Sequence, residues 1–139
     1  MCGRSGAYRL SQLFIADTVD AWPDEEDSLG WLGSFASYFF LYPAIRRLQG
    51  RTGQLIDLQQ RAFFSGAALE ELAAFEAESR QLVLEQPSTW QQHVGQSASG
   101  SIYDPASRQD LLRFLDDLSS AIGSARKLRK GVLFSGCDY

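Results

Sequence analysis

His93 is the first residue to consider for chemistry, since it is the only histidine in the chain and histidine is the side chain that most readily exchanges a proton near neutral pH. A lone histidine excludes a metal site that needs two imidazole ligands. Its neighbours Gln92 and Val94 offer no acid that could orient it as a general base. We therefore interpret His93 as a structural or surface residue.

Thiol and phosphate-binding chemistry also lack a sequence signature. Cys2 and Cys137 lie near opposite ends of the chain, and neither has the neighbours of an activated nucleophile. The glycines match neither the phosphate-binding loop with its lysine nor the dinucleotide fingerprint. We predict a protein without cofactor or metal, and the two isolated cysteines indicate a reducing, cytoplasmic setting.

Paired carboxylates are the remaining candidates for acid–base catalysis, and the chain offers several pairs. They are Asp116 with Asp117, Glu70 with Glu71, and Glu76 with Glu78. On helices that carry a clear apolar face, such acids usually form the solvated side, and no pair stands out as a dyad. We therefore predict no catalytic residue and no enzyme, with a small carboxylate-dependent enzyme kept as the third-ranked alternative.

The densest charge lies between Asp17 and Asp27, where acids follow one another without a Lys or Arg. Such a run is ordinarily a solvated loop, but with Trp22 as an apolar anchor it could also dock onto a basic protein. A second acidic surface is expected on the helix that follows residue 66. The candidate partner-binding residues are Asp20, Trp22, Asp24, Glu25, Glu26, Asp27, Glu70 and Glu71.

Length and composition limit the class of protein. The chain has 139 residues, 45% of them hydrophobic and 22% charged, which predicts one globular domain spanning residues 1–139. A net charge of −4 disfavours a nucleic-acid partner, because phosphate contacts need a basic stripe. The most apolar stretch, residues 29–42, is too short to span a membrane. The sequence leaves the oligomeric state open.

Hydrophobic periodicity predicts a mainly α fold of about five helices. Ser28 is the expected cap of a helix that ends or kinks near Tyr42, because Pro43 lacks an N–H group. A short helix is predicted around residues 55–63, a longer one over residues 68–82, and the clearest one from Pro105 to Leu128. Residues 96–101 are expected to form an exposed loop.

Two segments are ambiguous between helix and strand. Residues 8–21 fit either, and the strip 132–134 could form a short strand if it found a partner. The candidate partners are residues 13–16 and 101–103, so a small β element at one edge of the helical body is an open alternative. Within the aromatic helix over residues 29–42, Tyr38 and Phe40 are the side chains expected to face outward.

Several segments of the second half share a layout with one known group of proteins. They are Gln54–Gln59, Leu69–Phe75, Pro87–Trp90 with His93–Gly95, and Ala125–Gly136. Over about residues 54–139 the chain thereby resembles the small bacterial immunity proteins that neutralise toxins delivered between competing cells. The resemblance implies a compact cytosolic protein that occludes its cognate toxin domain, and it carries no individual functional residue across.

The leading hypothesis is accordingly a non-enzymatic immunity protein that binds a basic toxin domain by steric and electrostatic occlusion. The second is a regulatory or adaptor domain that binds another intracellular protein through the aromatic helix. These two differ in their dependence on salt, because charge-driven association weakens as ionic strength rises whereas apolar anchoring changes little.

Overall fold

The structure, a computed structural model, describes residues 10–136, which form an α/β fold of three α-helices and six strands. The elements are β1 (Leu10–Ala16), η2 (Glu25–Asp27), β2 (Gly30–Gly33), α1 (Phe35–Thr52), β3 (Arg61–Phe64), α2 (Ala67–Leu84), β4 (Thr89–Ser97), β5 (Gly100–Ser107), α3 (Arg108–Leu128) and β6 (Gly131–Ser135). The prediction of a mainly α fold with about five helices is therefore wrong. Cys2 and Cys137 lie outside the described residues.

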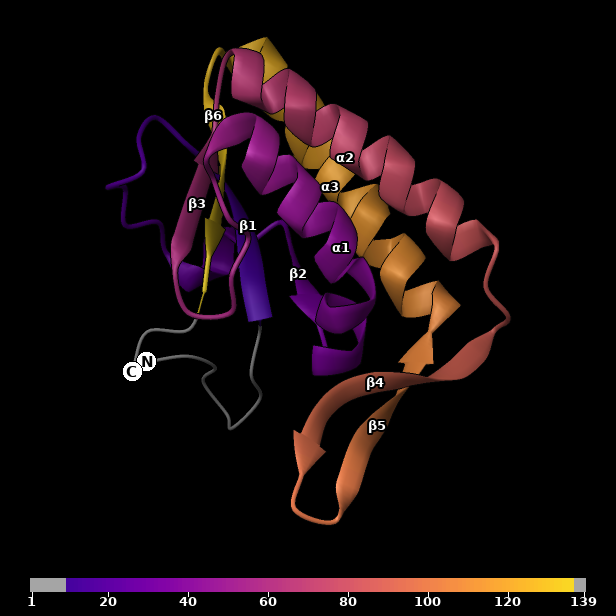
Figure 1. Ribbon diagram of the computed structural model, residues 1–139. Helices are drawn as coiled ribbons and strands as arrows, with labels where there is room; N and C mark the ends of the chain where they lie inside the picture. The colour runs from indigo at the N-terminus through magenta and orange to yellow at the C-terminus, as the bar shows by residue number, and fades with distance from the viewer. Residues whose placement is uncertain (1–9, 137–139) are drawn as a thin grey trace.

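The main sheet has four antiparallel strands in the order β2-β1-β6-β3. The three helices pack on one face of this sheet, and the loop between β1 and β2 runs over the other face (Figure 1). Strands β4 and β5 form a separate two-stranded hairpin that extends away from the body. No helix in the described part of the chain is both long enough and apolar enough to cross a membrane.

The first ambiguous segment folds as strand β1, because its side chains alternate between two buried faces. Leu13 belongs to the core beneath the helices, whereas Phe14 packs with Leu133 on the opposite face. Strand β6 pairs with β1 from Gln12 to Ala16, so the strip 132–134 is a strand and one of its two candidate partners is confirmed. Burial on both faces removes the simple polar alternation that marks a strand in a sequence.

The helix predicted from residue 29 begins later than expected, and it does not end near Tyr42. Residues 30–33 form β2, and α1 begins only at Phe35, where the Ser34 side chain accepts a hydrogen bond from the Ser37 N–H. The helix also continues through Pro43 to Thr52. Pro43 is exposed, and the buried residues on either side of it keep one continuous stripe against the core; they are Leu41, Ala44, Ile45 and Leu48.

The helix predicted over residues 55–63 does not form either. Residues 61–64 are strand β3, in which Ala62 and Phe64 are buried and their neighbours are half-buried. The expected loop over residues 96–101 is the turn of the β4–β5 hairpin and includes the ends of both strands. Pro105 lies within β5 rather than in the first turn of a helix.

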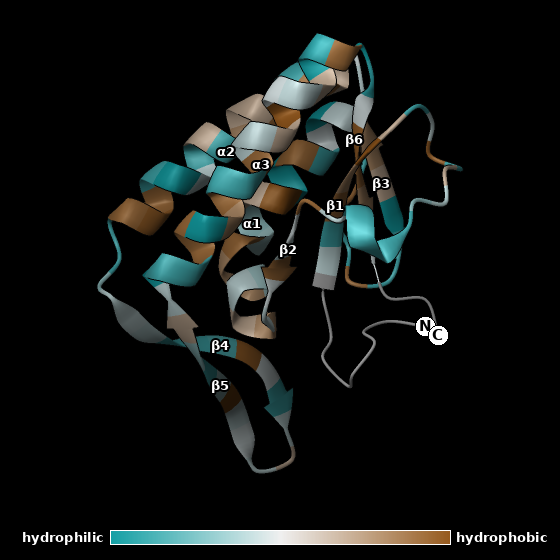
Figure 2. Cartoon of the chain, turned by 180° about the vertical axis from the view of Figure 1, so that it is seen from behind, coloured by the Kyte–Doolittle hydropathy of each residue, from teal (hydrophilic) through white to brown (hydrophobic). Residues whose placement is uncertain are grey.

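Helices α2 and α3 confirm the two strongest helix predictions, although α3 begins at Arg108. Ser107 caps α3 by accepting a hydrogen bond from the Asp110 N–H. Brown, apolar stretches and teal, polar ones alternate along the three helices in Figure 2, as expected for amphipathic helices. The helices bury Leu72, Phe75, Leu111, Phe114 and Leu118 among others in the main core.

The aromatic residues of α1 are mostly used in packing. Tyr38 is buried, contrary to the expectation that it faces outward, and its hydroxyl donates a hydrogen bond to the Ile56 carbonyl at 3.1 Å. Burial raises the pKa of Tyr38 to about 12. Phe40 is half-buried against Trp90 of β4, with ring centroids 5.0 Å apart. Among the aromatic side chains of this helix, Phe35 at its N-terminal end is the one that is largely exposed, at 51%.

Candidate functional site

The β1–β2 loop is held in place by Arg61, which reaches it from strand β3. Its Nη1 donates hydrogen bonds to the carbonyl of Val19, at 2.8 Å, and to that of Ala21. The same guanidinium lies 4.3 Å from the centre of the Trp22 ring, within the range of a cation–π contact. Arg61 thus fixes the backbone before Trp22 and supports one face of the indole.

Trp22 is the most exposed large apolar side chain among the described residues, with 82% of its surface accessible. Isolated exposed apolar residues are common, but a tryptophan left this open and held by a guanidinium is a typical anchor for a protein partner. We call Trp22 and the acids around it, Asp20 and Asp24–Asp27, the acidic loop.

The carboxylates of the acidic loop are largely free of internal cations. Within residues 10–136, Asp20, Asp24, Glu26 and Asp27 are exposed and form no ion pair. The nearest internal pair joins Asp17, just before the loop, to Lys130 at 3.8 Å, which is long for a salt bridge. The loop therefore presents negative charge that the rest of the described chain does not neutralise.

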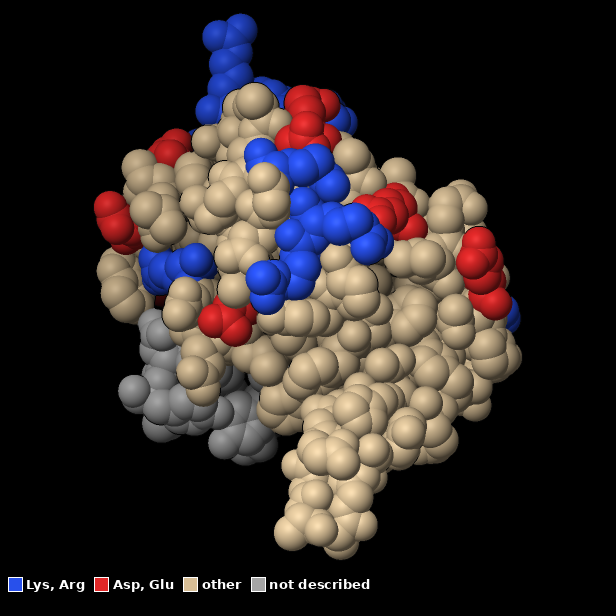
Figure 3. Space-filling view, in the orientation of Figure 1, with Lys and Arg blue, Asp and Glu red and all other residues tan. Residues whose placement is uncertain are grey.

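The acids of α2 are in the opposite situation. Glu70 is bound through both carboxylate oxygens by Arg126 of α3, at 2.7 and 3.1 Å, and Glu71 accepts a 2.7 Å hydrogen bond from Arg51 of α1. The Arg126 guanidinium lowers the pKa of Glu70. Acidic and basic side chains lie side by side over the helices in Figure 3, and Glu78 is likewise paired, with Arg47.

The eight predicted partner-binding residues are thus divided between two surfaces. Six of them, from Asp20 to Asp27, lie in the loop over the outer face of the sheet. Glu70 and Glu71 lie on the helical side and are engaged with arginines of neighbouring helices. The structure does not bring the two groups together, and the acids among the eight that form no ion pair within residues 10–136 are Asp20, Asp24, Glu26 and Asp27 of the loop.

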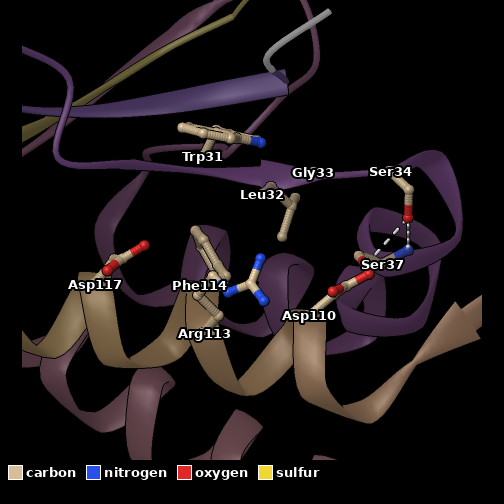
Figure 4. Close-up of a pocket in the computed structure, with 9 residues that line it drawn as sticks. All are labelled: Trp31, Leu32, Gly33, Ser34, Ser37, Asp110, Arg113, Phe114 and Asp117. Atoms are coloured by element: carbon tan, nitrogen blue, oxygen red, sulfur yellow. Dashed lines mark hydrogen bonds between the residues drawn. The ribbon is translucent and has the colours of Figure 1, made fainter.

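A cleft of about 370 Å³ lies between β2 and α3 and is lined by titratable groups (Figure 4). Asp110, Arg113 and Asp117 of α3 line it and face β2, while Ser34 and Ser37 close one end. Asp117 lies so close to the backbone of β2 that a Cβ at Gly30 would meet its Oδ2 at 2.7 Å. Glycine at position 30 is what allows this approach.

The cleft does not assemble the groups that catalysis by paired acids requires. Asp110 and Asp117 are two helical turns apart, about 10 Å along the axis, with Arg113 between them. His93 lies on the hairpin, where its ring meets Tyr103 edge-on at 5.4 Å. Among the described residues no three His, Cys, Asp or Glu side chains converge on a possible metal position.

Asp117→Asn should stabilise the protein at neutral pH, because burial and the neighbouring Asp116 raise the pKa of the Asp117 carboxyl while Arg113 opposes this. A folded-state pKa above the usual 3.8 means that the native state binds this proton more tightly than the unfolded chain. The ionised carboxyl therefore costs stability at neutral pH, and this cost disappears as the pH falls below 3.8. Thermal unfolding of both proteins between pH 7 and pH 3 measures the difference.

Asp110→Asn is the matched control for this prediction, since Asp110 is exposed in the first turn of the same helix. A negative charge there interacts favourably with the helix dipole, so its removal should not stabilise the fold. An Asp117→Asn advantage that stayed constant down to pH 3 would contradict the assignment of the effect to ionisation.

Three features of these surfaces were missed from the sequence: the Arg61 anchor, the arginines that engage Glu70 and Glu71, and the projecting hairpin. The first two depend on residues that are far apart in the chain, whereas the hairpin is formed by two strands that are neighbours in the sequence. Comparison with protein-family models, with curated proteins and with solved structures gives no match to this chain.

Proposed function

We propose that this chain is an immunity-type inhibitor that neutralises a basic toxin domain by binding it through the acidic loop. The observation that carries the proposal is the exposed Trp22, held by Arg61 and flanked in the sequence by Asp20, Asp24, Glu26 and Asp27, which form no ion pair within residues 10–136. An apolar anchor within a ring of charge is a typical arrangement for a tight protein interface. The resemblance of residues 54–139 to bacterial immunity proteins supports the toxin as the class of partner.

The mechanism would be occlusion rather than chemistry. A toxin that acts on nucleic acid needs a basic substrate-binding surface, and the acids of the loop match that charge. Long-range attraction would speed the encounter, and burial of Trp22 would slow dissociation. Binding over the basic surface would then keep the substrate out.

The direct test is co-expression with the C-terminal domain of a secreted protein encoded beside this chain, followed by a growth assay and co-purification. Rescue of growth together with a stable complex would support the proposal. If the neighbouring reading frame encodes no toxic domain, the proposal loses its expected partner and is contradicted. If it encodes a toxic domain that kills cells equally with and without this chain, the proposal is wrong.

Neutralising the acidic loop should slow association with the toxin domain by roughly 10- to 100-fold at low salt. The variant carries Asp20→Asn, Asp24→Asn, Glu26→Gln and Asp27→Asn, all at exposed positions without internal ion pairs. Its association rate should also lose most of its salt dependence. Surface plasmon resonance at two salt concentrations gives both quantities.

The double variant Glu70→Gln and Glu71→Gln is the control, since it removes acids that Arg126 and Arg51 already engage. Its association rate should stay within about twofold of the unmodified chain, because the two acids lie on the helical side, away from the loop. The control removes two charges and the loop variant four, so if the control slowed association about half as much on a logarithmic scale, recognition would depend on net charge alone and not on the loop.

A further inference from the structure

The β4–β5 hairpin has an unusual composition for an exposed element of an acidic protein. From Gln86 to Tyr103 the sequence contains no Asp, Glu, Lys or Arg, in a chain of net charge −4. On the face seen in Figure 3, the projecting part of the hairpin shows no charged side chain. Trp90 meets Phe40 edge-on at its base and Ala106 is buried there, so the hairpin is anchored to the body while its distal part extends outward (Figure 1).

The backbone hydrogen bonds at the base of the hairpin show which groups point outward. The Arg108 N–H donates to the Ser88 carbonyl at 3.0 Å. Ser88 directly precedes β4 and Arg108 directly follows β5, so these two residues form a hydrogen-bonded pair next to the pair Thr89–Ser107. Antiparallel pairs alternate between bonded and non-bonded, so the pairs Trp90–Ala106 and Gln92–Asp104 are bonded ones in this register. The backbone groups of the intervening residues of β4 therefore point away from β5.

Those residues are Thr89, Gln91 and His93, and we call their outward-pointing groups the β4 edge. Within the described part of the chain, no backbone group outside the hairpin bonds to them, and only the His93 carbonyl has an added partner, the Gln92 side chain at 3.2 Å. Edge strands are usually protected by lysine, proline, an inward charge or a β-bulge. From Thr89 to His93 the β4 edge has no lysine, proline or acidic residue, and the register irregularity of β4 lies beyond this stretch, between His93 and Gly95.

The other edge of the hairpin is protected. Pro105 of β5 lies opposite Gln91, so its nitrogen points outward and has no hydrogen to donate. Asp104 adds a negative charge to the same strand. The hairpin therefore has one edge that can accept a further strand and one that cannot.

We infer that the β4 edge pairs with the β4 edge of a second copy of this chain, which makes one continuous four-stranded sheet from two hairpins. An antiparallel arrangement about a two-fold axis at Gln91 places Gln91 opposite its counterpart and Thr89 opposite His93 of the second copy. These are the residues whose backbone groups point outward, so each pair can exchange two N–H···O bonds.

Two features favour a second copy as the occupant. The chain has a net charge of −4 and its acidic loop repels a second copy, whereas the β4 edge contains no Asp, Glu, Lys or Arg and brings two copies together without opposing charges. One open edge and one blocked edge per copy also close the assembly at a dimer and prevent a growing fibre. The inference does not rest on the proposed function, because the acidic loop lies on the outer side of the sheet, away from the hairpin.

Sedimentation velocity of the full chain from about 1 to about 200 μM tests this pairing, a range that covers weak and moderate dimers. A concentration-dependent dimer is expected. Gln91→Lys places like charges opposite each other at the two-fold axis, and Gln91→Pro removes an outward N–H without breaking a bond inside the hairpin. Each should raise the dimer dissociation constant at least tenfold. Gln109→Lys, the same change at an exposed position on α3, should leave it unchanged.

Amide hydrogen exchange provides the second measurement. In the dimer, the Thr89 and Gln91 N–H groups should become protected as the concentration rises, whereas the outward N–H of Tyr103 on β5 should not. A chain that stays monomeric over the whole range overturns the inference. So does a dimer that both Gln91 variants leave intact while circular dichroism shows them folded.

Discussion

Phe64→Ala is expected to lower the free energy of unfolding by about 3–5 kcal/mol, the usual cost of deleting a fully buried phenylalanine. Phe64 is 0% exposed and lies at the centre of the layer between sheet and helices. Its ring meets Phe134 of the neighbouring strand edge-on at 5.7 Å. The substitution removes both the burial and this aromatic contact. In urea, the unfolding midpoint should fall by roughly 2 M with an unchanged slope.

Phe63→Ala is the matched control, because it makes the same change one residue earlier in the same strand. Phe63 points to the outer face, where it packs half-buried against the small cluster around Phe14 and Leu133. Its loss should cost roughly 1–2 kcal/mol, in proportion to the smaller area that it buries. Equal losses at the two positions would contradict the assignment of the main core to the helical face of the sheet.

The helices with regular apolar spacing could be predicted from the sequence. Leu72, Phe75 and Ser79 of α2, and Leu111, Leu115 and Leu118 of α3, recur every three or four residues and are buried in the structure. These helices lie at the surface with one face inward, so the pattern of burial appears directly in the residue types.

The strands of the main sheet could not be predicted in the same way. Strands β2 and β3 have only four residues each, and β1 and β6 are buried on both faces, so none shows a long polar–apolar alternation. Tertiary packing also requires a glycine at position 131 of β6, since a Cβ there would meet the Phe63 ring at 2.5 Å. Nothing next to Gly131 in the sequence indicates that contact.

Pro43 is the clearest case in which tertiary packing overrides a local rule. A proline inside a helix removes one hydrogen bond and clashes with the preceding turn, which costs about 3 kcal/mol. Helix α1 nevertheless continues because Ala44, Ile45 and Leu48 extend the buried stripe begun by Leu41. Burial of these side chains offsets the local cost, and the balance is visible only once the core is known.

In the candidate site, too, features formed by neighbouring residues could be predicted, and features formed by residues far apart in the chain could not. The acidic loop is a local feature, and its residues could be named from the run of acids and from Trp22 beside them. Its anchor could not, since Arg61 acts on a carbonyl 42 positions away. In the same way, Glu70 is bound by Arg126, which is 56 positions away. The acids of the loop and those of α2 therefore looked equivalent in the sequence, but within residues 10–136 those of α2 are paired with arginines and most of the loop acids form no ion pair.

Trp22→Ala is expected to weaken the complex with a cognate toxin domain by roughly 30-fold or more, the loss of about 2 kcal/mol typical of a central anchor. The change should act mainly on the dissociation rate, because an apolar anchor forms its contacts after the encounter. Neutralising the acids of the loop should act mainly on association instead. Resonance measurements that separate the two rates therefore distinguish the anchor from the charges around it.

Leu84→Ala is the control for Trp22→Ala, since Leu84 is also an exposed apolar side chain but lies at the end of α2. It should leave both rates unchanged. Trp22→Ala itself should barely alter the free energy of unfolding, because the exposed indole loses little more than its contact with Arg61. If Trp22→Ala left the dissociation rate unchanged while the complex still formed, the partner would bind another surface. The Arg61–Trp22 contact would then serve only to order the loop.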